Sequence, residues 1–161
     1  MKIYKMREKI EKVFEDNKNR LFAVYNRDSL GLFCVNSYMY YRIPEIHILT
    51  ANLDAIRRGE ALCRMDARAP RPSDARDPVN GDLITFGSLP GKKNIIRLFN
   101  GDNYVYIDRK FTRTFPKNTV YFSKGAKDPV TAALIEGETV YAFAVIMPIR
   151  VFNDSDFTVM K

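Results

Sequence analysis

The spacing of hydrophobic residues changes from a helical period near the N-terminus to a strand-like pattern beyond it. In residues 3–16, apolar side chains recur every three or four positions, which is typical of one face of an amphipathic helix. Residues 21–25, 30–35 and 38–43 are short runs rich in aromatic and β-branched residues, with Asn, Asp and Ser between them. Because these polar residues favour turns, the pattern predicts a helix followed by a three-stranded antiparallel meander.

Hydrophobic runs in the second half of the chain predict more strands. They lie at residues 83–86, 95–99, 119–122, 130–135 and 139–149. A tight turn is predicted at Asn100 and Gly101, because both residues tolerate a positive φ. Asp108 predicts the N-cap of a short helix over residues 109–115, and Pro116 cannot continue that helix.

Each half of the chain therefore contains a helix and a meander of strands, without a visible repeat of residue identity. Strands from two such halves can pair into one antiparallel sheet, and a sheet needs its apolar face covered. The sequence thus predicts a single α+β domain over residues 1–161, built from two helix-plus-meander halves with both helices on one face of the sheet.

Two segments depart from this pattern. Residues 64–81 are rich in Pro, Arg and Asp and contain few large apolar side chains, which predicts an exposed connector or insertion. A mobile binding loop is the alternative, because arginines on a flexible segment suit phosphate contacts. Residues 153–161 form a polar tail, for which we expect a sheet edge or a frayed end.

Composition is that of an ordered globular protein. The 161 residues are close to the size of one domain, and 46% of them are hydrophobic and 28% charged. The longest apolar stretch, residues 139–147, is too short to span a bilayer, which takes about 20 residues. The charged N-terminus has no signal-peptide pattern, so we expect a cytoplasmic protein without a membrane partner.

Residue types that carry catalysis or bind metals are sparse. Cys34 and Cys63 lie far apart and His47 is the only histidine, so neither a metal site nor a cofactor is predicted. Residues 87–93 lack the spacing and the hydroxyl residue of a phosphate-binding loop. We therefore predict a non-enzymatic protein, with an enzyme of unknown class that uses His47 as an open alternative.

The chain is basic, and its cations gather on the predicted helices. Lysine and arginine number 26 against 19 acidic residues, which gives a net charge of +7 and a pI near 9.4. This balance favours an anionic partner such as DNA, although it also serves solubility. If both helices share one face, their bases can follow a phosphate backbone with little sequence preference. The candidate nucleic-acid-binding residues are Lys2, Lys5, Lys9, Lys12, Arg109, Lys110 and Arg113.

Other interpretations of these surface residues stay open. The same lysines and arginines can simply solvate the predicted helices. Tyr38, Tyr40 and Tyr41 lie on one predicted strand and offer stacking surfaces for exposed bases. Side-chain alternation places Tyr41 opposite the other two, so at least one of the two faces is expected in the core.

A run near the C-terminus carries a family resemblance. Residues 145–150 read Val-Ile-Met-Pro-Ile-Arg and resemble the closing strand of the bacterial DNA polymerase sliding clamp, which ends in a similar Met-Pro-hydrophobic-Arg run. The order and spacing of residues 103–108, 120–122 and 128–130 are similar to the last half-domain of that clamp, so the resemblance lies mainly in residues 95–150. It implies a duplicated unit in which two helices line a DNA-facing surface. Unlike that clamp, this chain has the length of about one such domain and continues past Arg150.

Two functional hypotheses follow. The first is a clamp-like module associated with DNA in DNA replication, for example of a phage or mobile element. The alternative is a protein-interaction module, such as an adaptor or inhibitor, that keeps the fold without binding DNA. Its sheet edges would then pair with a protein partner or with a second copy of the chain.

Overall fold

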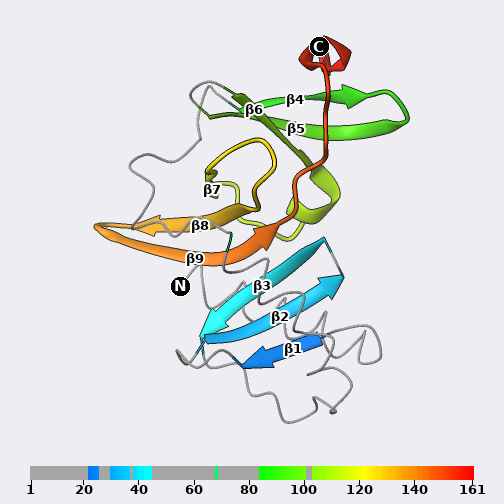
Figure 1. Ribbon diagram of the computed structural model, residues 1–161. Helices are drawn as coiled ribbons and strands as arrows, with labels where there is room; N and C mark the ends of the chain where they lie inside the picture. The colour runs from blue at the N-terminus through cyan, green and yellow to red at the C-terminus, as the bar shows by residue number, and fades with distance from the viewer. Residues whose placement is uncertain (1–21, 26–29, 37, 45–67, 69–83, 101–102) are drawn as a thin grey trace.

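The computed structural model describes residues 22–25, 30–36, 38–44, 68, 84–100 and 103–161. Almost all of its elements are strands (Figure 1). In chain order they are β1 (Phe22–Tyr25), β2 (Leu30–Asn36), β3 (Met39–Pro44), β4 (Ile84–Leu89), β5 (Lys92–Asn100), β6 (Asn103–Asp108), the 3-10 helix η2 (Arg109–Thr112), β7 (Val120–Phe122), β8 (Val130–Glu136), β9 (Thr139–Ile146), the 3-10 helix η3 (Asp154–Asp156) and β10 (Thr158–Val159).

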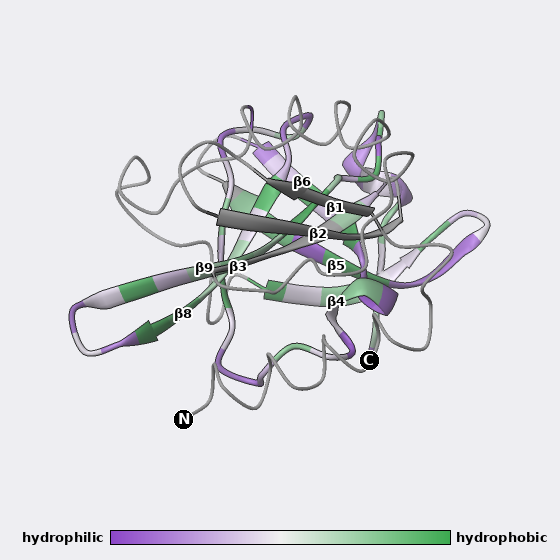
Figure 2. Cartoon of the chain, turned by 90° about the horizontal axis from the view of Figure 1, so that it is seen from below, coloured by the Kyte–Doolittle hydropathy of each residue, from purple (hydrophilic) through white to green (hydrophobic). Residues whose placement is uncertain are grey.

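The strands form two antiparallel sheets. The larger sheet has six strands in the order β1-β2-β3-β9-β8-β7, and the smaller has four in the order β10-β4-β5-β6. Pairing of β3 with β9, which places Met39 opposite Ile146, joins the N-terminal meander to the C-terminal strands. The β4–β5 and β8–β9 hairpins project towards opposite sides of the molecule (Figures 1 and 2).

Most strand positions follow the sequence pattern, but β6 is not among the strands that the hydrophobic runs predict, and one predicted strand ends earlier than expected. The predicted strand over residues 139–149 ends at Ile146 in the structure. Pro148 has no N–H to donate to a ladder, and beyond it the chain leaves β9 to form an isolated bridge between Ile149 and Tyr106 of the smaller sheet. The C-terminal segment therefore passes from one sheet to the other.

The α+β prediction is wrong for the described residues. Strands account for 54% of them and helices for about 10%, and no helix reaches 7 residues. The helix predicted over residues 109–115 is the single 3-10 turn η2, because so short a segment before Pro116 cannot sustain an α-helix by itself. The smaller sheet covers the apolar face that helices were expected to cover. Residues 3–16, the other predicted helix, lie outside the described residues.

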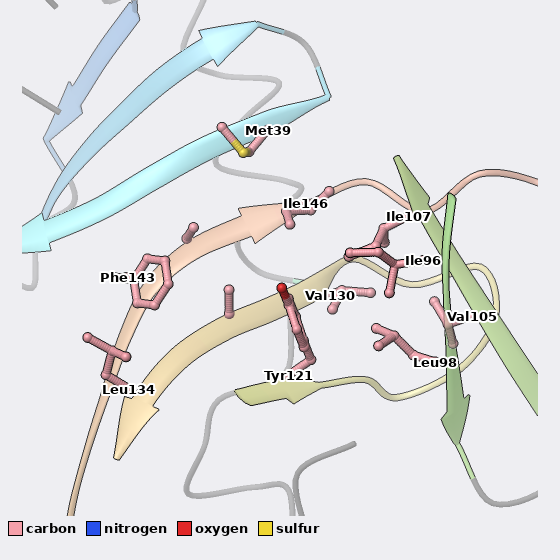
Figure 3. Packing of buried hydrophobic residues seen from close by; sticks show 12 residues of the cluster. Met39, Ile96, Leu98, Val105, Ile107, Tyr121, Val130, Leu134, Phe143 and Ile146 are labelled. Atoms are coloured by element: carbon pink, nitrogen blue, oxygen red, sulfur yellow. The ribbon is translucent and has the colours of Figure 1, made fainter. Parts of the chain in front are cut away.

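The main core lies between the two sheets. Alternate residues of β5 and β6 point from the smaller sheet onto residues of β7, β8 and β9 (Figure 3). Each fully buried aliphatic side chain there stabilises the fold by roughly 1.5–3 kcal/mol relative to exposure. The members of this cluster are Met39, Ile96, Leu98, Val105, Ile107, Tyr121, Val130, Ala132, Leu134, Phe143, Ala144 and Ile146.

A β-bulge in β9 adds an aromatic side chain to this core. Ala132 pairs with Ala144 and Ala133 pairs with Ala142, so Phe143 is the extra residue on β9. A bulge interrupts the alternation of side chains, which explains why Phe143 and Ala144 both belong to the main core. The ring of Phe143 meets that of Phe115 edge-on, with centroids 4.9 Å apart.

The other face of the smaller sheet is covered by the C-terminal segment. Ile95, Tyr106 and Phe157 form a second buried cluster, against which Ile149 and Val151 pack. Strand β10 extends this sheet by pairing with β4, and the Met160 N–H donates to the Phe86 carbonyl at 2.7 Å. The end of the chain is thus held by both packing and strand pairing.

Arg97 of β5 reinforces this attachment. Its guanidinium carbon lies 4.5 Å from the ring centroids of both Tyr104 and Phe157. A terminal nitrogen of the same group is 3.2 Å from a carboxylate oxygen of Asp154, and the Arg97 side chain is only 17% exposed. The arginine therefore links the middle of the smaller sheet to η3.

One residue of the predicted connector, Arg68, is described. Its guanidinium donates at 3.1 Å to the carboxylate of Asp128 and at 3.1 Å to the carbonyl of Lys127. This places Arg68 against the loop between β7 and β8. The rest of residues 64–81 lies outside the described residues.

The buried phenol of Tyr121 makes stability depend on pH in the alkaline range. Removal from water raises the pKa of Tyr121 from 10.0 to about 12, because burial disfavours the phenolate. Above about pH 10 the unfolded chain loses this proton while the folded chain keeps it, so stability falls as the pH rises towards 12. Between those pH values, urea titrations should show the free energy of unfolding falling by roughly 1–2 kcal/mol more in the wild type than in Tyr121→Phe. Equal slopes in the two proteins would contradict this assignment.

Gly87 sets the distance between β4 and the C-terminal segment. A Cβ atom at this position would overlap the Thr158 carbonyl and lie 2.5 Å from the Phe157 ring. We predict that Gly87→Ala displaces β10 and lowers the free energy of unfolding by roughly 1–3 kcal/mol, measured by urea titration. Gly125→Ala is the matched control, since its Cβ would meet only Asp128, at 3.6 Å. Equal stability of the two variants would show that β10 does not need this close approach.

Candidate functional site

The segment after β6 presents basic side chains outward because its aromatic residues are anchored in the core. Phe111 and Phe115 pack against the main core. The Asp108 carboxylate accepts the Lys110 N–H at 3.0 Å, which caps η2 as the sequence predicts. The exposed residues of this segment include Arg109, Lys110 and Arg113.

Strand pairing brings further polar residues to the same place. Ile95 of β5 is paired with Asp108 of β6, so the start of β5 lies beside the start of η2. Lys93 and Asn94 precede Ile95 and together face the single residue Ser88 of β4 in a bulge, where Asn94 has a φ of 60°. Asparagine tolerates this left-handed conformation better than most residues.

A basic pocket results, which we define by its lining residues. Its volume is about 440 Å³, and it lies between the beginning of β5 and the segment after β6. Positive side chains outnumber the single carboxylate, so the pocket attracts anions. The lining residues are Lys93, Asn94, Asp108, Arg109, Lys110 and Arg113.

The cations of the basic pocket differ in how they are held. The Arg109 guanidinium carbon lies 4.5 Å from the ring centroid of Phe86. Lys110 is more restrained, since its Nζ atom is 3.5 Å from an Asp108 carboxylate oxygen and 5.0 Å from the Phe111 ring centroid. Within the part of the chain that the structure describes, neither Lys93 nor Arg113 has an ion-pair partner. These two side chains are therefore available for an external anion.

A second pocket adjoins the first, and we call it the mixed pocket because it is both apolar and charged. Its volume is about 670 Å³, and it shares Asp108 and Lys110 with the basic pocket. Residues 147–152 form one side. The lining residues are Tyr38, Leu89, Pro90, Lys92, Asp108, Lys110, Phe111, Met147, Pro148, Ile149, Arg150, Val151, Phe152 and Asp156.

The mixed pocket contains unusually exposed aromatic surface. Phe152 is 99% exposed and Tyr38 is 62% exposed. Arg150 is also exposed, whereas Ile149 and Val151 pack against the second buried cluster. Alternation along this segment therefore directs Arg150 and Phe152 away from the core while their neighbours hold the segment in place.

Sequence reasoning found part of this site. The predicted residues Arg109, Lys110 and Arg113 line one pocket, whereas Lys2, Lys5, Lys9 and Lys12 lie outside the described residues. Lys93, which also lines the basic pocket, was not among the residues predicted from the sequence. The adjacent pair of lysines after the Pro90-Gly91 turn was a usable signal, but only the β5–β6 pairing shows which residues it meets.

Among the described residues, no group of His, Cys, Asp and Glu is arranged to hold a metal ion. His47, the candidate base of the enzyme alternative, lies outside them.

Within the described part of the chain, no helix has the length and hydrophobicity needed to cross a membrane.

Comparison with known proteins adds no relative. No protein-family model, no curated protein and no solved structure matches this chain. The resemblance of residues 95–150 to the bacterial sliding clamp therefore stays a hypothesis.

Proposed function

We propose that this protein is a non-enzymatic DNA-binding module that contacts the sugar–phosphate backbone through the basic pocket. The observation that carries the proposal is the convergence of Lys93, from β5, with Arg109 and Arg113, from the segment after β6. Arginine and lysine side chains supply most protein contacts to phosphate oxygens. The net charge of +7 adds a long-range attraction for a polyanion.

A polyanion suits the site better than a small anion does. The cations are exposed at the rim of two adjoining pockets, and Lys92 and Arg150 continue the positive charge beyond the basic pocket. A chain of phosphates can contact several of these groups at once and release counterions from each contact. Such contacts give affinity with little sequence preference. A cytoplasmic location, which the sequence predicts, is part of this proposal.

The resemblance to the sliding clamp supports DNA as the ligand independently of the charge of the pocket. The clamp-like run, residues 145–150, ends in the wall of the mixed pocket, next to the basic pocket. A role in DNA replication remains a hypothesis on this basis. The helix-lined architecture of the clamp is not part of the proposal, because η2 is a single 3-10 turn.

The proposal predicts a specific salt dependence. Fluorescence anisotropy with a labelled DNA should give an affinity that falls linearly with salt on logarithmic axes. The double variant Lys93→Gln/Arg113→Gln should lower the affinity and reduce the magnitude of this slope by about 2, because two phosphate contacts are lost. Lys124→Gln/Lys127→Gln is the matched control, since it removes the same charge from residues that line neither pocket. An equal loss of affinity in both double variants would show that net charge, and not the basic pocket, drives binding. No binding by the wild type would refute the proposal.

A variant that is expected to bind more tightly gives a further test, because an unfolded variant would bind more weakly. Asparagine at position 108 can still accept the Lys110 N–H as a helix cap, but it removes the carboxylate that pairs with the Lys110 ammonium. We predict that Asp108→Asn binds DNA roughly two- to fivefold more tightly than the wild type at low salt. Weaker binding by a folded Asp108→Asn protein would show that the carboxylate does not oppose the ligand.

A second candidate function rests on the projecting β8–β9 hairpin. Ile135, Val140 and Tyr141 near its turn are 40%, 37% and 42% exposed, which provides apolar surface for a protein partner or a second copy. We propose this as the basis of the adaptor alternative. Light scattering on the wild type should then show a DNA-independent oligomer that Val140→Ser/Tyr141→Ser converts to a monomer. A monomeric wild type would show that the adaptor alternative does not involve self-association.

A further inference from the structure

Phe152 is an aromatic residue that the fold does not use. Its side chain is 99% exposed, so it contributes almost nothing to burial, whereas a buried phenylalanine stabilises a fold by roughly 1.5–3 kcal/mol. Its position is nevertheless well defined. The neighbouring Val151 packs against the buried cluster of Ile95, Tyr106 and Phe157.

The surroundings of Phe152 combine aromatic surface with positive charge. Tyr38, 62% exposed, lines the same pocket, together with Lys92, Lys110 and Arg150. The carboxylates of Asp108 and Asp156 are the opposing charges in that lining. Because Asp108 and Lys110 also line the basic pocket, a strand bound there would continue directly into the mixed pocket.

This combination distinguishes unpaired DNA from a duplex. In a duplex the faces of the bases are stacked on one another and inaccessible, so a protein meets the phosphates, the sugars and the base edges in the grooves. An unpaired base exposes a flat face that stacks on an aromatic ring, while its phosphate remains available to the neighbouring cations. Phe152 therefore adds affinity only when the bound strand is single.

We propose that the ligand of the two adjoining pockets is single-stranded DNA, with its phosphates on the basic pocket and a base stacked on Phe152. This inference rests on the proposed DNA-binding function and narrows it to one form of the ligand. Arg150 lines the same pocket as Phe152 and carries a flat, charged group that can contact the same base or its neighbour.

The first experiment compares three labelled ligands of equal length by fluorescence anisotropy: oligothymidylate, the same sugar–phosphate chain without bases, and a duplex. The wild type should bind oligothymidylate most tightly. Phe152→Ala should lower oligothymidylate affinity roughly 5- to 100-fold and should abolish the preference over the abasic chain. Phe152→Leu should behave like the alanine variant, because it is apolar without an aromatic face.

A second measurement detects the stacked base directly. The chain contains no tryptophan, so Phe152→Trp introduces a single indole fluorophore. It should retain tight binding, and its fluorescence should be quenched by oligothymidylate and unaffected by the abasic chain. An unquenched indole in a saturated oligothymidylate complex would overturn the stacking role.

The outcomes separate this inference from the proposed function. Equal affinity for oligothymidylate and the abasic chain, with both sensitive to Lys93→Gln/Arg113→Gln, overturns the single-strand inference and retains DNA binding by the basic pocket. Absence of binding to all three ligands overturns both. A fourth ligand, oligouridylate of the same length, tests the sugar: if it binds more tightly than oligothymidylate, the assignment to DNA is overturned.

Discussion

The structure depends on the burial of side chains from both faces of β5 and β6. Ile96 and Ile107 point into the main core between the sheets, while Ile95 and Tyr106 point into the second cluster under the C-terminal segment. Two central strands thus hold the larger sheet on one side and the end of the chain on the other. Because each cluster is apolar and closed by packing, the smaller sheet cannot rotate without exposing one of them.

The candidate site lies at one end of these strands, and its parts are positioned by that packing. Phe115 anchors the basic segment after β6 by its edge-on contact with Phe143, which the bulge in β9 turns into the core. On the opposite side, Arg97 binds Asp154 and lies between two aromatic rings, which holds the segment that carries Arg150 and Phe152. Rigid apolar anchors therefore support exposed groups that contribute little to stability, which is the usual arrangement of a binding surface.

The two adjoining pockets give the surface two kinds of interaction. The basic pocket offers mainly positive charge, which attracts anions over a long range. The mixed pocket offers aromatic faces as well as charge. Asp108 occupies the boundary, where it caps η2 and pairs with Lys110. The Asp108 carboxylate thus stabilises the local fold, and its negative charge lowers the positive potential of the basic pocket.

The sequence by itself determined most of the strands, although not β6, because aromatic and β-branched runs bounded by turn residues are local signals. It also indicated the Asp108 cap of η2 and the bases Arg109, Lys110 and Arg113, which the structure shows to be exposed. Tertiary structure decided what local signals cannot carry. Which sheet or helix covers an apolar face depends on pairings between distant segments, such as β3 with β9, and a helical pattern over residues 109–115 is too short to resist them. The grouping of Lys93 with Arg113, and of Tyr38 with Phe152, likewise follows from strand register and from the route of the C-terminal segment, because residues far apart in the chain meet only when the sheets pack.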